Sequence, residues 1–269
     1  MPELPEMETY RMLLTDKLIG KKITRVQIDR EKTVNVSAQS FIQTVEGAQI
    51  QGITRRAKHL LFHLDNGFVL LLHLMLGGWM YLGTDLDKPQ RTFQVILSFD
   101  LEHLYFIGLR LGYLHLLTAE EAEERLSQLG PEPFAPSFSE QAFLHRTEAK
   151  KGKIKTTLID QKWLAGIGNC YSDEISYAAG LLPDRPLNRL QLDEKKRLYS
   201  SIFAVLQEAI SFGGYMEHPL FKEDHLTGGY NEQCKVYDRE GERCFRCGHP
   251  IQKAEISSRK MFYCSGCQK

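Results

Sequence analysis

Short apolar runs dominate the first 120 residues of the chain. Several of them alternate apolar with polar positions, as HLLFHL (59–64) does, and this is the period of a half-buried β-strand. Turn signals such as Asp65-Asn66-Gly67 separate the runs. The runs that we expect to form strands are 24–29, 59–64, 68–76, 93–99 and 103–108. The pattern predicts an N-terminal β-sandwich.

A helix is expected ahead of these strands. Pro5 suits a first-turn position. The apolar residues that follow it fall on one helical face; they are Met7, Tyr10, Leu13 or Leu14, and Leu18.

The apolar period becomes helical after residue 140, with apolar residues three and four positions apart. The stretch GPEPFAPSFS (130–139) comes before this change, and its prolines and glycine are typical of a linker. We therefore predict an α+β multidomain chain. Its parts are an N-terminal domain at 1–130, a linker at 131–140, a helical domain at 141–233 and a C-terminal hairpin at 234–269.

Composition limits the class of protein. With 269 residues, of which 42% are hydrophobic, the chain can bury the core of one large or two medium domains. Its longest apolar run, 68–76, contains His73 and has about half the length of a bilayer span. The start, MPELPEMETY, carries acids where a secretory signal has basic and then apolar residues. We expect a cytoplasmic protein with no membrane segment.

Net charge does not indicate a polyanionic partner, because 34 basic residues balance 34 acidic ones. The basic residues are nevertheless concentrated in the second half. Residues 145–156 carry five Lys or Arg against one Glu, and residues 234–269 carry eight against four acids. Each cluster alone is also typical of an ordinary solvated surface.

Four of the six cysteines form the pattern Cys244-x2-Cys247-x16-Cys264-x2-Cys267. In a cytosolic chain this spacing is typical of a tetrathiolate zinc site rather than of disulfides. We expect one structural Zn²⁺ per chain, which stabilises a hairpin too small to fold alone. Arg259 lies between the two cysteine pairs, and spacing alone does not say what it touches.

The segment Gly166-Ile167-Gly168-Asn169 lies between two helical patterns. Two glycines permit a tight turn, and the helix start after them exposes amides that can hold a phosphate. The segment is similar to a helix-two-turn-helix element that binds nucleic acid. A plain connection between two helices would have the same four residues.

The N-terminus carries a further candidate. Methionine is normally removed when proline follows it, which leaves Pro2 as a secondary amine with a pKa near 8, well below the roughly 10.4 of lysine. Such an amine can attack a sugar C1′ and form an iminium, with Glu3 beside it as proton donor. Lys58, in the basic cluster Arg55-Arg56-Ala57-Lys58, precedes a predicted strand and is suited to a phosphate contact. A proline-flanked helix start and a solvated basic cluster remain the simpler interpretations.

Taken together and in this order, these segments resemble the formamidopyrimidine-DNA glycosylase and endonuclease VIII family over the whole chain. The matching segments are MPELPEMET, RRAKHLL, LIDQKWLAGIGNCYSDEISYAAGLLP and VYDREGERCFRCGHPIQKAEISSRKMFYCSGCQK. The resemblance implies a catalytic β-sandwich domain with an N-terminal helix, a helical domain with the two-turn element, and a C-terminal zinc hairpin. It implies a base-excision glycosylase with AP lyase activity that works as a monomer on damaged DNA near the nucleoid.

The resemblance also implies roles for individual residues. Pro2 would be the Schiff-base nucleophile and Glu3 the proton donor, with Glu6 supporting the pocket. Lys58 would assist elimination and bind phosphate. The implied contacts to the DNA backbone are Lys58, Lys151, Lys155, Asn169 and Arg259, of which Arg259 also counts among the catalytic residues.

Two loops depart from the family pattern. In the formamidopyrimidine branch a methionine, an arginine and a phenylalanine fill the space left by the extruded nucleotide. Here Leu76, or Met75 with a one-residue shift, stands at the first position, and Gly108-Leu109-Arg110-Leu111-Gly112 at the other two. Arg110 replaces the arginine only if the alignment shifts. We expect lesion recognition to be altered, toward single-stranded, mispaired or bulky-adduct sites.

Two other functions are compatible with the same residues. One is a non-catalytic DNA-binding module that keeps Asn169, Arg259 and zinc; the leucine-rich loop favours it, whereas Pro2, Glu3 and Lys58 favour an enzyme. The other is a structural RNA-binding protein, but such proteins are normally far more basic than this chain.

Overall fold

Helix α1 (Leu4–Leu18) begins the chain, and its apolar face is the one that the sequence predicts. Met7, Tyr10, Leu14 and Leu18 are all buried in the core of the first part of the protein. The computed structural model describes all of residues 1–269. It divides them into unit 1, Met1–Gln128 with Phe212–Gly229, and unit 2, Leu129–Ser211 with Tyr230–Lys269.

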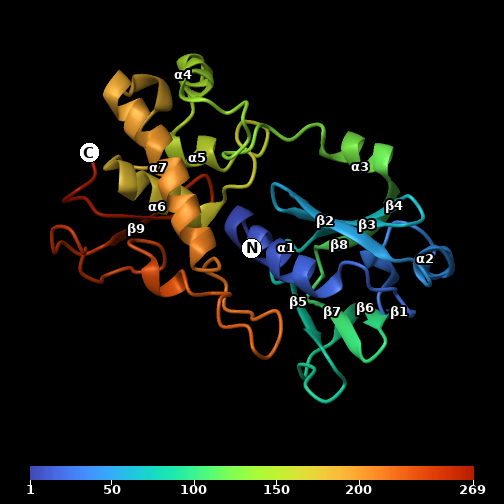
Figure 1. Ribbon diagram of the computed structural model, residues 1–269. Helices are drawn as coiled ribbons and strands as arrows, with labels where there is room; N and C mark the ends of the chain where they lie inside the picture. The colour runs from blue at the N-terminus through green and yellow to red at the C-terminus, as the bar shows by residue number, and fades with distance from the viewer. The chain divides into compact units, whose positions relative to one another are not determined.

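Unit 1 is a sandwich of two antiparallel four-stranded sheets (Figure 1). One sheet has the order β1–β6–β7–β5, with β1 (Arg25–Ile28), β6 (Phe93–Phe99), β7 (Glu102–Ile107) and β5 (Trp79–Gly83). The other has the order β2–β3–β4–β8, with β2 (Ile50–Arg56), β3 (His59–Leu64), β4 (Phe68–His73) and β8 (Tyr113–Thr118). Apolar side chains of both sheets and of α1 form one core, so the predicted N-terminal sandwich is confirmed.

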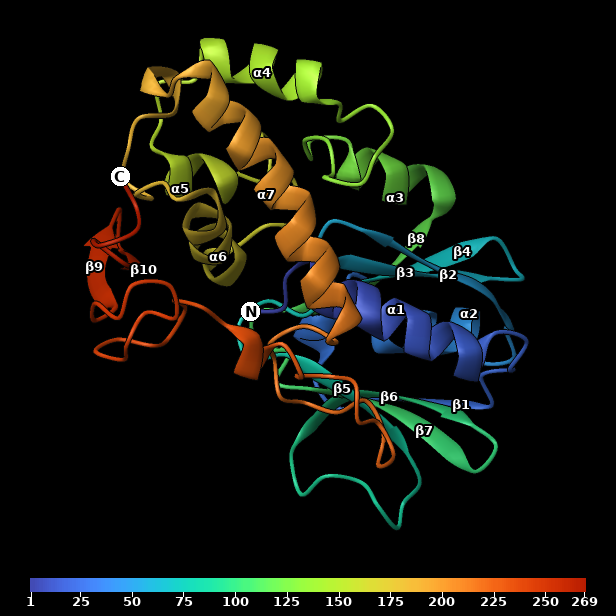
Figure 2. The same ribbon diagram turned by 60° about the vertical axis from the view of Figure 1, so that its left-hand side comes forward.

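Shorter elements complete unit 1. They are the 3₁₀ helix η1 (Glu31–Thr33), α2 (Ala38–Val45) and α3 (Ala119–Leu126). The segment Phe212–Gly229 also belongs to this unit and lies beside β5 (Figure 2), where the Leu82 amide donates to the Leu220 carbonyl at 2.6 Å.

The chain passes between the two sheets of unit 1 at β1–β2, through α2, and again at the β4–β5 and β7–β8 turns, which we call the crossing turns. The two crossing turns touch each other through glycine. Gly108 has φ +71°, and a Cβ there would lie 2.1 Å from the Gly77 carbonyl oxygen, so no larger residue fits. The guanidinium of Arg30 donates to the carbonyls of Leu109 and Arg110, each at 3.0 Å. Both turns are therefore held in fixed positions.

Unit 2 is helical with a small hairpin at its end (Figure 2). Its elements are α4 (Glu140–Glu148), α5 (Ile154–Leu158), α6 (Asn169–Ala179), η2 (Leu187–Arg189), α7 (Leu192–Ser211), η3 (Asn231–Gln233), β9 (Gln252–Ile256) and β10 (Arg259–Tyr263). Helix α6 packs against α5, α7 and β10. The helical domain and the terminal hairpin predicted from the sequence are present, and no helix is long and apolar enough to cross a bilayer.

The units differ from the domains predicted from the sequence in two respects: the predicted linker (131–140) and hairpin (234–269) belong to unit 2 together with the helices, and residues 212–229 do not. The sequence assigns 212–229 to the helical domain, whereas its contacts place it with the sandwich. The physical reason is Leu220, a fully buried member of the sandwich core.

Candidate active site and nucleic-acid interface

The N-terminus of unit 1 is held by the carboxylate of Glu6. Its Oε2 accepts the Glu3 main-chain N–H at 2.7 Å, and its Oε1 accepts the Tyr215 N–H at 2.9 Å. The Tyr215 hydroxyl donates to the Met1 carbonyl at 3.3 Å. Pro2, Glu3 and Glu6 are buried. The main chain is thus held at Met1 and at Glu3, the residues before and after Pro2.

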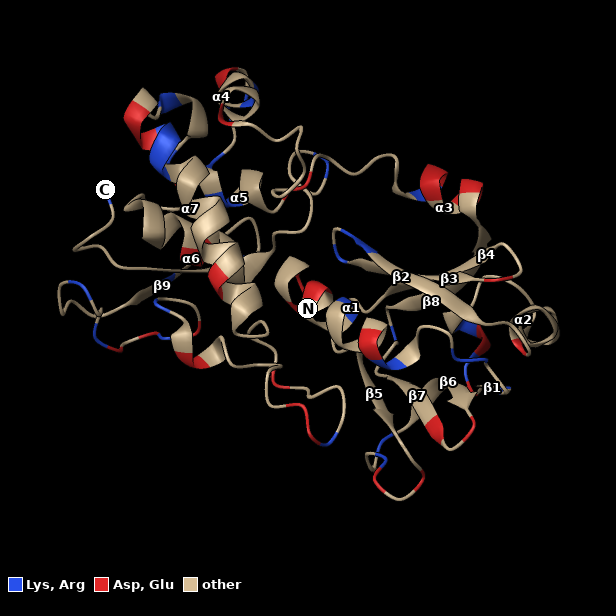
Figure 3. Ribbon diagram, viewed as in Figure 1, with Lys and Arg blue, Asp and Glu red and all other residues tan.

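Lys58 lies at the turn between β2 and β3, where Ala57 has φ +53°. The tip of this hairpin is basic (Figure 3). A chain of polar contacts ties the turn to α1, because the Arg55 guanidinium donates to Glu8 at 2.7 Å and to the Ala57 carbonyl at 3.1 Å. Burial acts to raise the pKa of Glu8, but hydrogen bonds from Arg11 and Arg55 outweigh it and lower that pKa.

The side chain of Lys58 is 4% exposed and close to His73 at the end of β4. Burial, and after it the charge of Lys58, lowers the pKa of His73 to about 4. A neutral His73 accepts the Met75 N–H at Nδ1, at 3.0 Å. Lys58 is therefore next to the β4–β5 turn that carries Leu76.

Leu76 and Leu111 project from the two crossing turns with 62% and 63% of their surface exposed. Leu109 is fully buried, and Arg110 is exposed. Leu76 and Leu111 are therefore the apolar side chains of these turns that project into solvent. Arg110 lies between the buried Leu109 and the exposed Leu111.

In unit 2, Asn169 is the first residue of α6. Gln161 shapes the turns before it, since its Oε1 accepts the Gly166 N–H at 3.0 Å and its Nε2 donates to the Ile167 carbonyl at 2.8 Å. The side-chain Oδ1 of Asn169 is buried with no hydrogen-bond partner. A buried polar atom without a partner is rare in proteins. That oxygen is an acceptor and does not bind phosphate; the groups of this helix start that are suited to a phosphate are its main-chain N–H groups.

Lys155 does not lie on the surface, where the predicted DNA contact requires it. The prediction of a DNA backbone contact is wrong, because its side chain is 0% exposed and its Nζ lies 2.7 Å from Oδ1 of Asp173. The same Nζ donates to the Asn169 carbonyl at 3.2 Å. Lys155 therefore supports the start of α6 from inside, whereas the neighbouring Lys151 is exposed.

Two carboxylates of α6 attach the C-terminal hairpin. Oδ2 of Asp173 accepts the Phe262 N–H of β10 at 3.0 Å. Glu174 accepts three main-chain N–H groups, those of residues 235, 236 and 237, at 2.8 to 2.9 Å. Arg259 is the exposed first residue of β10, three positions before Phe262. Asn169 and Arg259 thus both depend on α6 for their positions.

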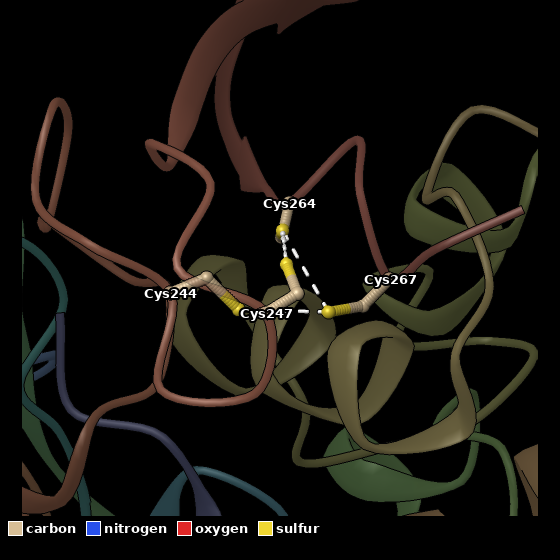
Figure 4. A group of neighbouring side chains, drawn as sticks. All are labelled: Cys244, Cys247, Cys264 and Cys267. Atoms are coloured by element: carbon tan, nitrogen blue, oxygen red, sulfur yellow. Dashed lines mark hydrogen bonds between the residues drawn. The ribbon is translucent and has the colours of Figure 1, made fainter.

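The four cysteines of the spaced motif come together in unit 2 (Figure 4). All four Sγ atoms lie within 4.8 Å of one another. Three of their separations are 3.4, 3.6 and 3.8 Å. Tetrahedral Zn²⁺ with bonds of about 2.3 Å would place its sulfurs about 3.8 Å apart. The donor set and its spacing therefore fit one zinc ion held by Cys244, Cys247, Cys264 and Cys267.

Several residues of this site were not predicted from the sequence. They are Glu8, Arg55, Gln161, Asp173, Glu174, Gly214 and Tyr215. The local signals among them were the glycine pair at 213–214 and the basic cluster that contains Arg55. The other residues act through partners far away along the chain.

A β-sandwich whose buried N-terminus is held by a carboxylate, together with a two-turn helical element and a four-cysteine hairpin, defines a protein of the helix-two-turn-helix class that acts on DNA. Residues 1–113 match the formamidopyrimidine-DNA glycosylase N-terminal domain and residues 129–218 match the formamidopyrimidine-DNA glycosylase H2TH domain. The chain belongs to the formamidopyrimidine-DNA glycosylase family.

Relatives match over their whole length. Formamidopyrimidine-DNA glycosylase of Desulfitobacterium hafniense is 34% identical over 272 residues, covering 100% of both chains. The Geobacillus kaustophilus protein of the same name is 35% identical over 275 residues, with the same coverage. Among solved structures, a complex of Lactococcus lactis Fpg with DNA containing an abasic site has a TM-score of 0.91 and 32% identity over 99% of each chain. Its complex with N7-benzyl-Fapy-dG DNA has a TM-score of 0.92 and 32% identity over 100% of each.

Proposed function

We propose that this chain is a DNA glycosylase with AP lyase activity, and that the nucleophile is the amine of Pro2. The observation that carries the proposal is the hold of Glu6 on the residue after Pro2: one carboxylate oxygen accepts the Glu3 N–H and the other accepts the Tyr215 N–H, and neither contact involves Met1. The relatives named above are glycosylases, and one of their structures contains an abasic site. Removal of Met1 is required, because with Met1 in place the nitrogen of Pro2 is an amide.

The bond changes follow from the chemistry of a secondary amine. The Pro2 nitrogen attacks C1′ of the damaged nucleotide, the glycosidic bond breaks, and the base leaves with its electron pair and takes up a proton. The carboxyl group of Glu3 protonates the ring oxygen O4′, so the sugar opens to an iminium on Pro2. Loss of a C2′ proton then expels the 3′ phosphate by β-elimination. Water hydrolyses the iminium and restores the amine.

Each unit has its own candidate groups for binding phosphates. In unit 1, we assign to Lys58 a phosphate next to the reacting sugar; its side chain is 4% exposed in the protein without DNA and has to move outward from the β2–β3 turn to reach that phosphate. In unit 2, Asn169 at the start of α6 and Arg259 at the start of β10 bind phosphates of the damaged strand, and the exposed Lys151 adds a backbone contact. Zinc bound by the four cysteines stabilises the hairpin that carries Arg259.

The duplex shields C1′, so the damaged nucleotide must leave the stack before Pro2 can reach it. We assign the filling of the vacated space to Leu76 and Leu111, the two exposed side chains of the crossing turns. Neither leucine donates a hydrogen bond. The chain therefore recognises the opposite base weakly, which separates it from enzymes that use an arginine there.

The test is borohydride trapping. Protein whose loss of Met1 is verified by intact mass is incubated with a single strand that contains an abasic site, and borohydride is added. A covalent adduct is expected; it should be absent with Pro2→Gly and weaker with Glu3→Gln. A form with an uncleaved N-terminal extension is the matched control, because it keeps every side chain and blocks only the amine.

The same experiment tests the alternative. DNA binding without any adduct from the processed protein would overturn the lyase proposal and favour a non-catalytic DNA-binding protein of the same fold. An adduct that persists in the extended form would instead show that a lysine is the nucleophile.

A further inference from the structure

Unit 1 contains a cavity of about 430 Å³ between helix α3 and the β2–β3–β4–β8 sheet. The helix lies on the side of this sheet that faces away from the other sheet of the sandwich (Figures 1 and 2). Leu61 and His63 of β3 line the cavity. Leu60 and Phe62, which alternate with them, belong to the sandwich core on the other side of the sheet. The cavity is therefore separate from the core, and none of its lining residues belongs to the proposed active site or to the crossing turns.

Small side chains on α3 leave this space open. The helix packs against β8 and β4, and its apolar residues in the cavity wall are Ala119, Ala122 and Leu126. Two alanines fill less of the space above Leu61 and Val69 than larger side chains would. Most of the lining is thus apolar, which is typical of sites that bind small molecules.

The cavity exists before any ligand binds, because both ends of α3 are fixed. Thr118 is the last residue of β8 and pairs with Phe68 of β4. Its hydroxyl oxygen accepts the Glu121 N–H at 3.2 Å, and the Glu121 carboxylate accepts the Thr118 N–H at 2.8 Å. At the other end, the Ser127 hydroxyl donates to the Glu124 carbonyl at 2.7 Å. The helix therefore begins at a defined place beside the sheet and holds the cavity open.

The rest of the lining is polar and carries one positive and one negative charge. These residues are Arg56, His63, Glu123 and Ser127. Burial lowers the pKa of His63, so its imidazole is neutral at pH 7, and its Nε2 lies 2.8 Å from the Thr54 hydroxyl. Arg56 at the end of β2 is half-buried, whereas Glu123 on α3 is exposed.

This difference in exposure decides which charge a ligand senses. Electrostatic interactions are stronger where less water surrounds the charges. Arg56 therefore attracts a bound anion more strongly than Glu123 repels it. A guanidinium also presents several N–H donors in one plane, which match the oxygens of an acid group.

We propose that this cavity binds a small amphipathic organic anion, with its apolar body between α3 and β3 and its acid group on Arg56. A volume of about 430 Å³ falls within the roughly 300–1,000 Å³ of sites that hold small molecules. A carboxylate or sulfonate on an apolar body uses both the apolar lining and the charge. A neutral molecule of the same shape gains nothing from the charge of Arg56.

The test uses naphthalene-2-sulfonate as the probe and naphthalene-2-sulfonamide as its neutral counterpart of similar shape. Each is titrated by calorimetry into the full-length protein at low salt, without DNA. The sulfonate is expected to bind at a single site per chain, about tenfold more tightly than the sulfonamide, since hydrogen bonds to a charged group are the stronger ones.

Substitutions in the lining test where the probe binds. Arg56→Gln should remove the preference for the sulfonate. Glu123→Gln should tighten binding of the sulfonate about two- to threefold, the effect of one exposed charge, and leave the sulfonamide unchanged. Glu120→Gln is the matched control and should change neither affinity, because Glu120 is exposed on the same helix but does not line the cavity. Ala122→Phe fills the cavity and should abolish binding of both compounds.

Equal affinities for the two compounds would overturn the proposal, because the cavity would then be an apolar space that does not select an anion. Binding that is unchanged in Arg56→Gln and Ala122→Phe would place the probe elsewhere on the protein, and no binding of either compound would also refute the site. If circular dichroism shows that Ala122→Phe does not fold, Arg56→Gln and Glu123→Gln decide the outcome, because neither alters the apolar part of the lining.

Discussion

Gly214 and Glu6 are 208 positions apart in the sequence, and they are in such close contact that only glycine fits at position 214. A Cβ on Gly214 would lie 2.3 Å from Oε1 of Glu6. That oxygen accepts the Tyr215 N–H, while the other carboxylate oxygen accepts the Glu3 N–H. The glycine therefore allows one carboxylate to join the segment 212–229 to the residue next to the proposed nucleophile.

Gly214→Ala is expected to slow borohydride trapping, because Glu6 must move away and release Glu3. Misplacement of a reacting group by about 1 Å can cost on the order of 10²-fold in rate. Gly67→Ala is the matched control, since Gly67 also has a positive φ (+82°) but no atom lies within 4 Å of the added Cβ. Both variants should lose about 1–2 kcal/mol of stability from backbone strain, measured by urea unfolding. Equal trapping rates in the two variants would contradict this role for Glu6.

Lys151 and Lys155 lie four residues apart, and opposite effects are expected from their removal. Lys155→Met leaves Asp173 as a buried unpaired carboxylate, which should cost about 3–5 kcal/mol of stability. Lys155→Met combined with Asp173→Leu should recover part of that loss. Lys151→Ala should leave stability unchanged and reduce the salt dependence of DNA binding by about one ion. A stable Lys155→Met protein with a reduced salt dependence would restore the original prediction of a DNA contact.

The error at Lys155 shows what local sequence cannot provide. Five basic residues within 145–156 are typical of a solvated or phosphate-binding surface. The partner that buries one of them, Asp173, is 18 positions away on another helix. Glu6 with Gly214 is the same case over a longer separation. Pairings of this kind depend on tertiary packing and not on any local period.

Local sequence patterns predicted the structure correctly where the pattern lies within a single element or motif. The apolar face of α1 follows from a period of 3.6 residues, and the hairpin β9–β10 follows from two cysteine pairs. Three strands were not predicted, namely β2, β5 and β8. β2 ends in the Arg55-Arg56 pair, and β5 follows a glycine pair, so their short apolar signals are interrupted at one end. The pairing of β8 with β4 provides the order that its own sequence does not indicate.

Removal of a cysteine ligand is expected to release zinc and weaken DNA binding. Cys264→Ser should lower zinc from one ion per chain to none, measured by mass spectrometry of the metal. Because the hairpin also carries Arg259, affinity for abasic DNA should fall with the metal. Cys234→Ser is the matched control, since Cys234 is also buried but lies outside the four-cysteine cluster. Full zinc content in the Cys264 variant would exclude the tetrathiolate site.

Leu76→Ala and Leu111→Ala are expected to slow cleavage of a duplex abasic site but not of the same single strand, since only a duplex has a space to fill. Leu101→Ala, also strongly exposed but at the β6–β7 turn, should change neither. Cleavage opposite the four bases should differ little, because the about 1–3 kcal/mol that a bidentate donor provides is missing. A strong preference for 8-oxoguanine opposite cytosine would refute this expectation.

The histidines near Lys58 give unit 1 a specific pH dependence. His59 and His73 face each other on β3 and β4 with ring centroids 4.4 Å apart, and His59 is within 3.0 Å of the Tyr113 hydroxyl. Burial is the largest cause that lowers the pKa of His59 to about 3 and of His73 to about 4, followed by His73 for the first and Lys58 for the second. Both histidines are neutral in the folded protein at pH 7.

The direction in which stability changes with pH follows from the difference in proton binding between the folded and unfolded chains. Below pH 6.5 the unfolded chain binds protons at these histidines and the folded chain does not, so acid favours unfolding. Stability is fully present above about pH 6.5 and is lost as the pH falls toward the folded values of about 4 and about 3. Each histidine contributes a slope of up to about 1.4 kcal/mol per pH unit.

Urea unfolding between pH 7.5 and 4.5 measures this slope. The chain has two tryptophans, Trp79 in unit 1 and Trp163 in unit 2, so a Trp163→Phe background makes fluorescence report on unit 1 alone. Adding His59→Gln should reduce the change of unfolding free energy with pH by the contribution of one histidine. His145→Gln, at an exposed position in unit 2, should leave that pH dependence unchanged. Parallel profiles for His59→Gln and its parent would mean that the folded protein protonates His59 as readily as the unfolded chain does. The buried pair would then not be the source of acid sensitivity, and the carboxylates of unit 1 would have to account for it.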